Sequence, residues 1–177
     1  KFFGEYGHIV AQILLTKDVL EKDILRTNVS NTFETLLEKE IIPIVNENDP
    51  VSTDEIIGDT SFGDNDTLSA LVAHLLKADC LIILSDIDGF YSADPKKDKT
   101  AILVSEIEEV TPEVEAKAGG VGSNRGTGGM ATKLKAAKLV NAQGIPLIIA
   151  QGSKPERLYN ILQGEDVGTL FKGKSHE

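Results

Sequence analysis

Apolar residues along the chain form two patterns, short continuous runs and stripes at helical spacing. The runs are bounded by glycine, proline or charged residues, which is typical of buried strands. They cover residues 9–16, 41–45, 81–84 and 145–150. The stripes recur every three or four residues within 26–40 and 68–76, and each predicts a helix with one buried face. Because strands alternate with helices at this spacing, the pattern predicts an α/β sandwich around a mostly parallel sheet.

The remaining segments extend this alternation. Further expected elements are a short strand and a helix within 102–115, helices at 134–143 and 155–162, a final edge strand at 168–171 and a hairpin or flap at 51–61. Gly144 is the expected C-cap of the helix before it. The chain has 177 residues, and it shows no internal repeat and no convincing linker. It is therefore expected to form a single domain over residues 1–177.

A glycine-rich stretch, residues 126–133, leads directly into a predicted helix. Lys133, Lys135 and Lys138 crowd the first two turns expected for that helix, where each cation costs about 0.3–1 kcal/mol against the helix dipole. Backbone amides before a helix form a cradle for anions, and an added lysine points to phosphate. The alternative is a flexible loop before a solvated basic helix. The stretch lacks the adjacent Gly-Lys-Ser/Thr of the Walker A loop and the GxGxxG of dinucleotide-binding folds, which disfavours both classes.

Three polar tips follow predicted strands or precede a predicted helix. They lie at residues 46–49, 64–66 and 85–88, and each contains carboxylates. If they share one edge of a parallel sheet, they face the glycine-rich stretch. Clustered carboxylates need a cation; Mg²⁺ on a nucleotide, a lysine or the ammonium group of an amino-acid substrate would serve. The alternative is turn and capping chemistry, for which Asp and Asn are common. Taken with the glycine-rich stretch, the tips favour phosphoryl transfer.

Composition narrows the function classes. The net charge is −10, which argues against a nucleic-acid or anionic-membrane partner. A single cysteine, Cys80, lies in an apolar run and predicts a core thiol in a reducing compartment. No apolar run approaches the roughly 18 residues that span a bilayer, and no signal-peptide pattern opens the chain. The expectation is a soluble, cytoplasmic protein. His74 falls off its apolar stripe, which predicts an ordinary, partly exposed histidine.

Together, these blocks resemble the glutamate 5-kinases of the amino-acid kinase family. The resemblance covers nearly the whole chain, in the right order. The blocks that carry it are residues 46–49, 62–70, 85–86, 89–95, 126–133, 151–155 and 168–171. The GDND block at 63–66 and the GTGGMxTK block at 126–133 separate the chain from aspartokinase, acetylglutamate kinase and uridylate kinase relatives. The resemblance implies a three-layer αβα sandwich with a mostly parallel central sheet.

The resemblance also implies an activity: ATP-dependent phosphorylation of the L-glutamate γ-carboxylate to glutamyl 5-phosphate, with Mg²⁺, as the first step of proline biosynthesis. Lys133 would stabilise the transition state, and Asp66 would orient the catalytic lysine side chains. Glutamate would be bound by Asp49 and Asn65, with Asn46 and Asp64 nearby. ATP would be contacted by Ser85, Asp86, Thr127, Gly128, Gly129, Met130, Ala131, Thr132 and Lys133. Homo-oligomers are implied as well.

The chain departs from the family pattern at its start. It begins about a hundred residues into that pattern, and so lacks the first strand and the glycine-rich loop with a second catalytic lysine. It is also too short for the C-terminal RNA-binding-like domain that some members carry. Two further functions therefore stay open: a nucleotide-binding fragment without turnover, and another amino-acid kinase relative.

Overall fold

The computed structural model describes residues 2–48, 64–95, 97–118 and 129–173. The flap predicted at 51–61 and residues 126–128 of the glycine-rich stretch lie outside these residues. The chain divides into two compact units, Lys1–Leu68 and Ser69–Glu177, which are described separately below. The prediction of a single domain stays a prediction.

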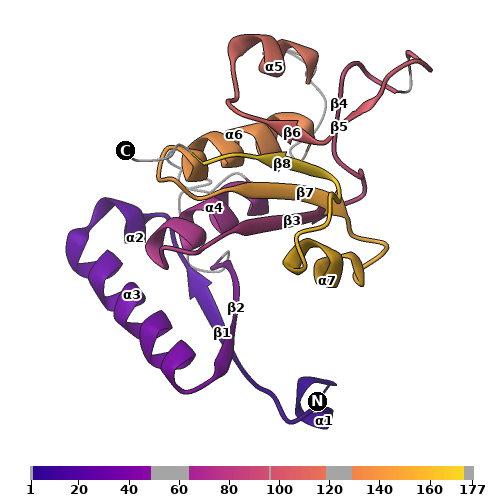
Figure 1. Ribbon diagram of the computed structural model, residues 1–177. Coiled ribbons are helices and arrows are strands. Elements are labelled where there is room, and N and C mark those ends of the chain that lie inside the picture. The colour runs from indigo at the N-terminus through magenta and orange to yellow at the C-terminus, as the bar shows by residue number, and fades with distance from the viewer. Residues whose placement is uncertain (1, 49–63, 96, 119–128, 174–177) are drawn as a thin grey trace. The chain divides into compact units, whose positions relative to one another are not determined.

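The first unit is built on two parallel strands joined through helices. Strand β1 (Ile9–Leu15) pairs in parallel with β2 (Ile41–Glu47), and α3 (Asp23–Glu38) makes the connection with α2 (Asp18–Glu21). A short helix, α1 (Phe2–Glu5), precedes them (Figure 1). Phe33, on the apolar stripe of α3, is fully buried. The strands and the helix predicted for this region are confirmed. The helix provides the crossover connection that a parallel pair of strands requires.

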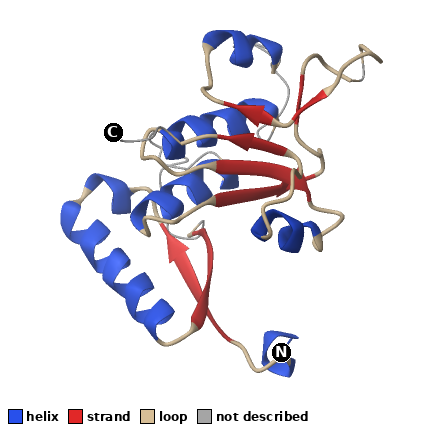
Figure 2. Ribbon diagram, in the orientation of Figure 1, coloured by secondary structure: helices blue, strands red, loops and turns tan. Residues whose placement is uncertain are grey.

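The second unit is built on a four-stranded sheet in the order β3-β7-β8-β6. Its strands are β3 (Leu81–Ser85), β7 (Leu147–Gln151), β8 (Thr169–Phe171) and β6 (Glu106–Ile107). The β3/β7 and β6/β8 pairs are parallel, and β7/β8 is antiparallel. A separate hairpin joins β4 (Phe90–Tyr91) to β5 (Leu103–Val104). The mostly parallel α/β class is confirmed (Figure 2).

Strand β8 was wrongly predicted as an edge strand. It lies between β7 and β6, and the side chains of Thr169 and Phe171 are fully buried. Phe171 packs edge-on against Phe90, with 6.4 Å between the ring centroids. The short apolar segment therefore belongs to the interior of the sheet, because β6 covers its outer side.

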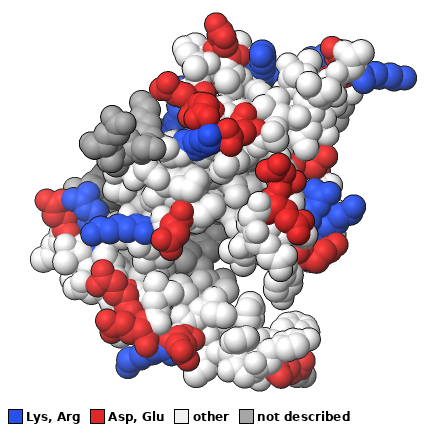
Figure 3. Space-filling model, in the orientation of Figure 1, with Lys and Arg blue, Asp and Glu red and all other residues white. Residues whose placement is uncertain are grey.

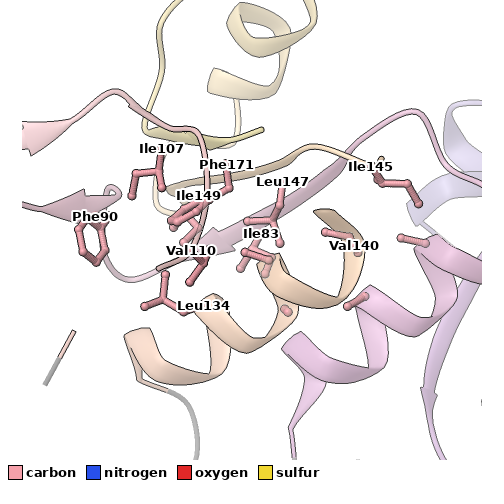
Figure 4. Close-up of a cluster of buried hydrophobic side chains, with 14 residues drawn as sticks. Ile83, Phe90, Ile107, Val110, Leu134, Val140, Ile145, Leu147, Ile149 and Phe171 are labelled. Carbon is pink, nitrogen blue, oxygen red and sulfur yellow. The ribbon is translucent and has the colours of Figure 1, made fainter. Parts of the chain in front are cut away.

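Helices cover both faces of this sheet. Residues 69–75 of α4 (Asn65–Leu75) and all of α6 (Met130–Asn141) lie on one face, and α7 (Arg157–Leu162) lies on the other (Figure 4). Between the sheet and the first two helices is the buried cluster that contains Ile83, Leu134, Val140, Leu147 and Ile149. The short helix predicted within 102–115 is confirmed as α5 (Pro112–Lys117), and the side chain of Thr111 caps it.

Helix α6 begins at Met130, four residues earlier than predicted. It ends in a Schellman motif: Gly144 has a φ of 78°, and the N–H of Ile145 donates to the carbonyl of Val140 at 3.0 Å. The terminating role of Gly144 is therefore confirmed. The predicted position of Lys138 in the first two turns is wrong, since it lies in the last turn, where the dipole favours a cation. There it pairs with Glu115 at 2.6 Å.

Within the described parts of the chain, every helix is too short or too polar to cross a lipid bilayer.

Candidate active site

Two parallel strands of the second unit end side by side. In the β3/β7 pair, Ser85 lies opposite Gln151, so both chains leave the sheet at the same edge. Asp86 follows Ser85 and is exposed, and the hydroxyl of Ser85 donates to its Oδ1 at 3.0 Å. Ser85 and Asp86, the predicted ATP contacts, therefore form a polar tip at the carboxyl end of the sheet, where ligands of α/β folds commonly bind.

The N-terminus of α6 lies at this same edge. The chain reverses once between α6 and β7, so the start of the helix lies at the end of the strand (Figure 4). Gly129 is the N-cap, in extended conformation, and provides no side-chain cap. No acidic residue occupies the first turn. The positive end of the helix dipole is thus not neutralised by side chains of its own first turn, which favours an anionic ligand.

Lys133 is the buried lysine of this helix. Only 6% of its surface is exposed, whereas Lys135 and Lys138 are exposed. Elsewhere in the unit, Lys172 is half-buried and pairs with Glu106 and Glu108 at 2.7 Å each. Acidic and basic side chains are interspersed over the face of the molecule in Figure 3. Lys133 therefore stands out from the surface lysines by its burial close to the helix N-terminus.

The other predicted nucleotide contacts on α6 occupy its first turn. Met130, Ala131 and Thr132 follow the N-cap, and the hydroxyl of Thr132 donates to the carbonyl of Gly129 at 2.8 Å. Thr127 and Gly128 lie outside the described residues, as does Asp49.

The second acidic tip is a helix cap. The carboxylate of Asp64 accepts from the backbone N–H of Thr67 at 2.7 Å and from its hydroxyl at 3.1 Å. The capping alternative raised by the sequence is thus confirmed for Asp64. Asn65 begins α4 and is exposed, and Asp66 is half-buried in the first turn. Asn46 is exposed near the end of β2. These four residues belong to the first unit, so their position opposite Lys133 stays a prediction.

The hairpin that follows the Ser85–Asp86 tip carries a polar pair. The phenol of Tyr91 donates to both carboxylate oxygens of Asp88 at 3.1 Å. Burial, then the hydrogen bond to Asp88 and its negative charge, raises the pKa of Tyr91 above its usual range. Cys80, just before β3, is half-buried rather than a core residue, and burial together with Asp79 raises the pKa of its thiol. His74 is exposed, as predicted.

Gln151 and Gly152 were assigned no role from the sequence, yet they contact the Ser85–Asp86 tip directly. The N–H of Gly152 donates to the carbonyl of Ser85 at 2.7 Å. A Cβ on Gly152 would lie 3.2 Å from that oxygen, so glycine permits the close approach. The available signal was weak, a polar residue and a glycine directly after an apolar strand.

The chain is similar to known proteins in sequence and in fold. A model of the amino acid kinase family matches residues 1–151. The chain is 60% identical over all 177 residues to a protein of Clostridium perfringens named glutamate 5-kinase, and 55% identical to one of the same name from Listeria innocua. It spans 66% and 64% of the lengths of these relatives.

The fold of the chain is similar to that of a solved structure. The crystal structure of UMP kinase from Bacillus anthracis superposes with a TM-score of 0.63 at 17% sequence identity. The superposition covers 98% of this chain and 62% of that one.

Proposed function

The chain belongs to the amino acid kinase family, and from this premise we propose that its protein is a glutamate 5-kinase. The reaction is transfer of the γ-phosphoryl group of ATP to the γ-carboxylate of L-glutamate, which gives glutamyl 5-phosphate and ADP. This is the first step of proline biosynthesis. The proposal is supported by the 60% and 55% identity to relatives of that name over the whole chain.

One observation carries the phosphoryl-transfer part of the proposal: a buried lysine close to a helix N-terminus, at the sheet edge where the Ser85–Asp86 tip lies. The first-turn amides of α6 would bind nucleotide phosphates, and Ser85 and Asp86 would bind the rest of the nucleotide. The ammonium group of Lys133 would offset the charge that develops on the transferred group. Fixed donors of this kind act by holding reactants in line and neutralising charge.

The acceptor side rests on residues of the first unit and of the segment outside the described residues. We assign glutamate binding to Asp49 and Asn65, with Asn46 and Asp64 nearby. A carboxylate such as Asp49 would pair with the substrate ammonium group. Asp66 would orient the catalytic lysine side chains.

Mg²⁺ is the cofactor we propose, and when bound to ATP it neutralises phosphate charge. Among the described residues there is no group of three or more His, Cys, Asp or Glu side chains that could hold a metal ion. Mg²⁺ commonly binds through substrate phosphates and retains several waters. We further propose a cytoplasmic homo-oligomer.

The test is an assay of the entire gene product with ATP, Mg²⁺ and hydroxylamine, which traps an acyl phosphate as its hydroxamate. L-Glutamate should give hydroxamate, whereas L-aspartate and N-acetylglutamate should not. Hydroxamate with only one of the latter would replace the substrate assignment by another member of the family. ATP binding in calorimetry without turnover on any acceptor would favour a nucleotide-binding protein without catalytic activity instead.

A further inference from the structure

The side-chain amide of Gln151 lies against the backbone of the Ser85–Asp86 tip. In the orientation that pairs donors with acceptors, its nitrogen donates to the carbonyl of Ser85 at 2.9 Å and to that of Asp86 at 3.0 Å. The Ser85 carbonyl also accepts from the N–H of Gly152 at 2.7 Å. Three hydrogen bonds from the end of β7 thus hold two consecutive carbonyls at the end of β3.

These bonds determine where the tip points. The last ladder pair of the two strands is Ser85 with Gln151. Beyond this pair, the Gln151 side chain supports Asp86, and the turn at Gly152 supports Ser85. Fixing both carbonyls orients the peptide between Ser85 and Asp86, and therefore the two side chains, which are themselves hydrogen-bonded at 3.0 Å. Without the amide, the exposed Asp86 would sample other backbone conformations.

We propose that Gln151 is a positioning residue for the nucleotide: its amide holds the Ser85–Asp86 tip in the conformation that binds ATP. The proposal rests on the function proposed above and adds a specific determinant of nucleotide affinity. Gln151 acts through the backbone of the tip. If only about one tenth of the molecules held the competent tip after loss of the amide, the apparent Kd for ATP would rise about tenfold.

The fold itself should not depend on this side chain. Gln151 is half-buried at the edge of the sheet, whereas β7 is anchored by Leu147, Ile149 and Ala150, which are fully buried. Removing the amide should therefore change ATP binding much more than stability. Loss of a purely structural residue would instead lower Tm and kcat and raise both KM values together.

The experiment compares Gln151→Met, which keeps the length of the side chain and removes both donors, with Gln163→Met, the same change at an exposed position after α7. KM for ATP, KM for glutamate, kcat and Tm are measured on the entire gene product. For Gln151→Met we expect KM for ATP to rise about tenfold, with little change in kcat, in KM for glutamate or in Tm. Gln163→Met should match the unsubstituted protein in all four.

A second variant keeps the proposal testable if Gln151→Met does not fold. Gln151→Glu replaces the donors by acceptors that face two carbonyl oxygens, so its KM for ATP should rise at least as far; Gln163→Glu controls for the added charge. The proposal is overturned if the Gln151 variants keep the KM for ATP of their controls, or if kcat, both KM values and Tm all deteriorate together. If the unsubstituted protein binds no ATP, the proposed function fails with it, and that outcome is distinct because no variant is needed to see it.

Discussion

The hydroxyl of Thr169 accepts a hydrogen bond of 2.8 Å from the backbone N–H of Phe90, a residue 79 positions earlier in the chain. The same hydroxyl donates to the carbonyl of Val104 at 2.6 Å. One fully buried side chain on β8 thus holds both strands of the β4–β5 hairpin. Gly89 permits this contact, since a Cβ there would lie 2.6 Å from the hydroxyl oxygen.

We predict that Thr169→Val destabilises the protein by about 1–3 kcal/mol, because the buried N–H of Phe90 loses its acceptor. Urea unfolding followed by circular dichroism measures the change. Thr35→Val is the control: Thr35 is exposed on α3, and its hydroxyl donates only to the Asn31 carbonyl within the helix. It should change stability by about 0.5 kcal/mol or less. Equal effects of the two substitutions would contradict the role of the Phe90 bond.

Two glycines with nearly the same backbone conformation should respond differently to alanine. Gly168 has a φ of 74° and Gly164 a φ of 80°. A Cβ on Gly168 would lie 2.0 Å from the carbonyl oxygen of Ile149, whereas one on Gly164 meets nothing within 4 Å. Gly164→Ala should cost only the left-handed strain, about 1–2 kcal/mol. Gly168→Ala should cost clearly more, because β7 or β8 must move.

Thermal unfolding of the two variants tests this comparison directly. Similar losses in Tm would show that β7 and β8 tolerate the added methyl group.

The packing beneath the candidate site gives a third prediction. Leu134, next to Lys133 on α6, is 1% exposed and belongs to the buried cluster, whereas Leu139 on the same helix is 39% exposed. Leu134→Ala should destabilise by about 2–5 kcal/mol, since it removes apolar contacts and leaves a cavity. Leu139→Ala should cost about 1 kcal/mol or less. Urea unfolding of both variants measures the difference, and a larger loss for Leu139→Ala would refute the assigned orientation of α6.

Tyr91 should ionise at a higher pH than an ordinary tyrosine, whose pKa is about 10. Burial and Asp88 raise the pKa of Tyr91 in the folded protein. Because the raised pKa belongs to the folded state, the associated stability is fully present below about pH 10 and is lost as the pH rises through the folded-state value. Phenolate absorbance of the protein minus that of Tyr91→Phe isolates this titration. A difference curve centred at or below the ordinary value would contradict the Asp88 contact.

Two lysines on α6 separate the catalytic proposal from a general effect of positive charge. Lys133→Met keeps the buried stem but removes the ammonium group, and it should lower kcat by about 10²–10³-fold if that group stabilises the transition state. Lys135→Met removes the same charge from an exposed position on the same helix and should leave kcat nearly unchanged. Equal losses in the two variants would show that only the overall charge of the helix matters.

Local pattern was sufficient to predict most elements. The apolar runs of β1, β2, β3 and β7 and the stripe of α3 were recognised because burial of one face imposes a period on the sequence itself. The capping of α4 by Asp64 and the termination of α6 at Gly144 were predictable for the same reason, since each depends on residues a few positions apart.

The start of α6 was harder to predict. The glycines of residues 126–129 hide the boundary, and without it Lys138 was placed in the first two turns rather than the last. Six of the residues that the resemblance assigns to ATP binding lie at the end of β3 or at the start of α6. They are Ser85, Asp86, Gly129, Met130, Ala131 and Thr132, and their binding of ATP stays a prediction. Each marks the end of a strand or the start of a helix.

The sequence by itself thus determined the elements and the polar residues at their ends, because these depend on neighbours within one or two turns. Only the tertiary structure decided that β8 is an interior strand, since its outer partner, β6, lies about sixty residues earlier in the chain. In the same way, only the parallel register of β3 and β7 places Gln151 against Ser85. Contacts between distant segments arise from packing, and the spacing of apolar residues within one segment does not show which distant segment it will contact.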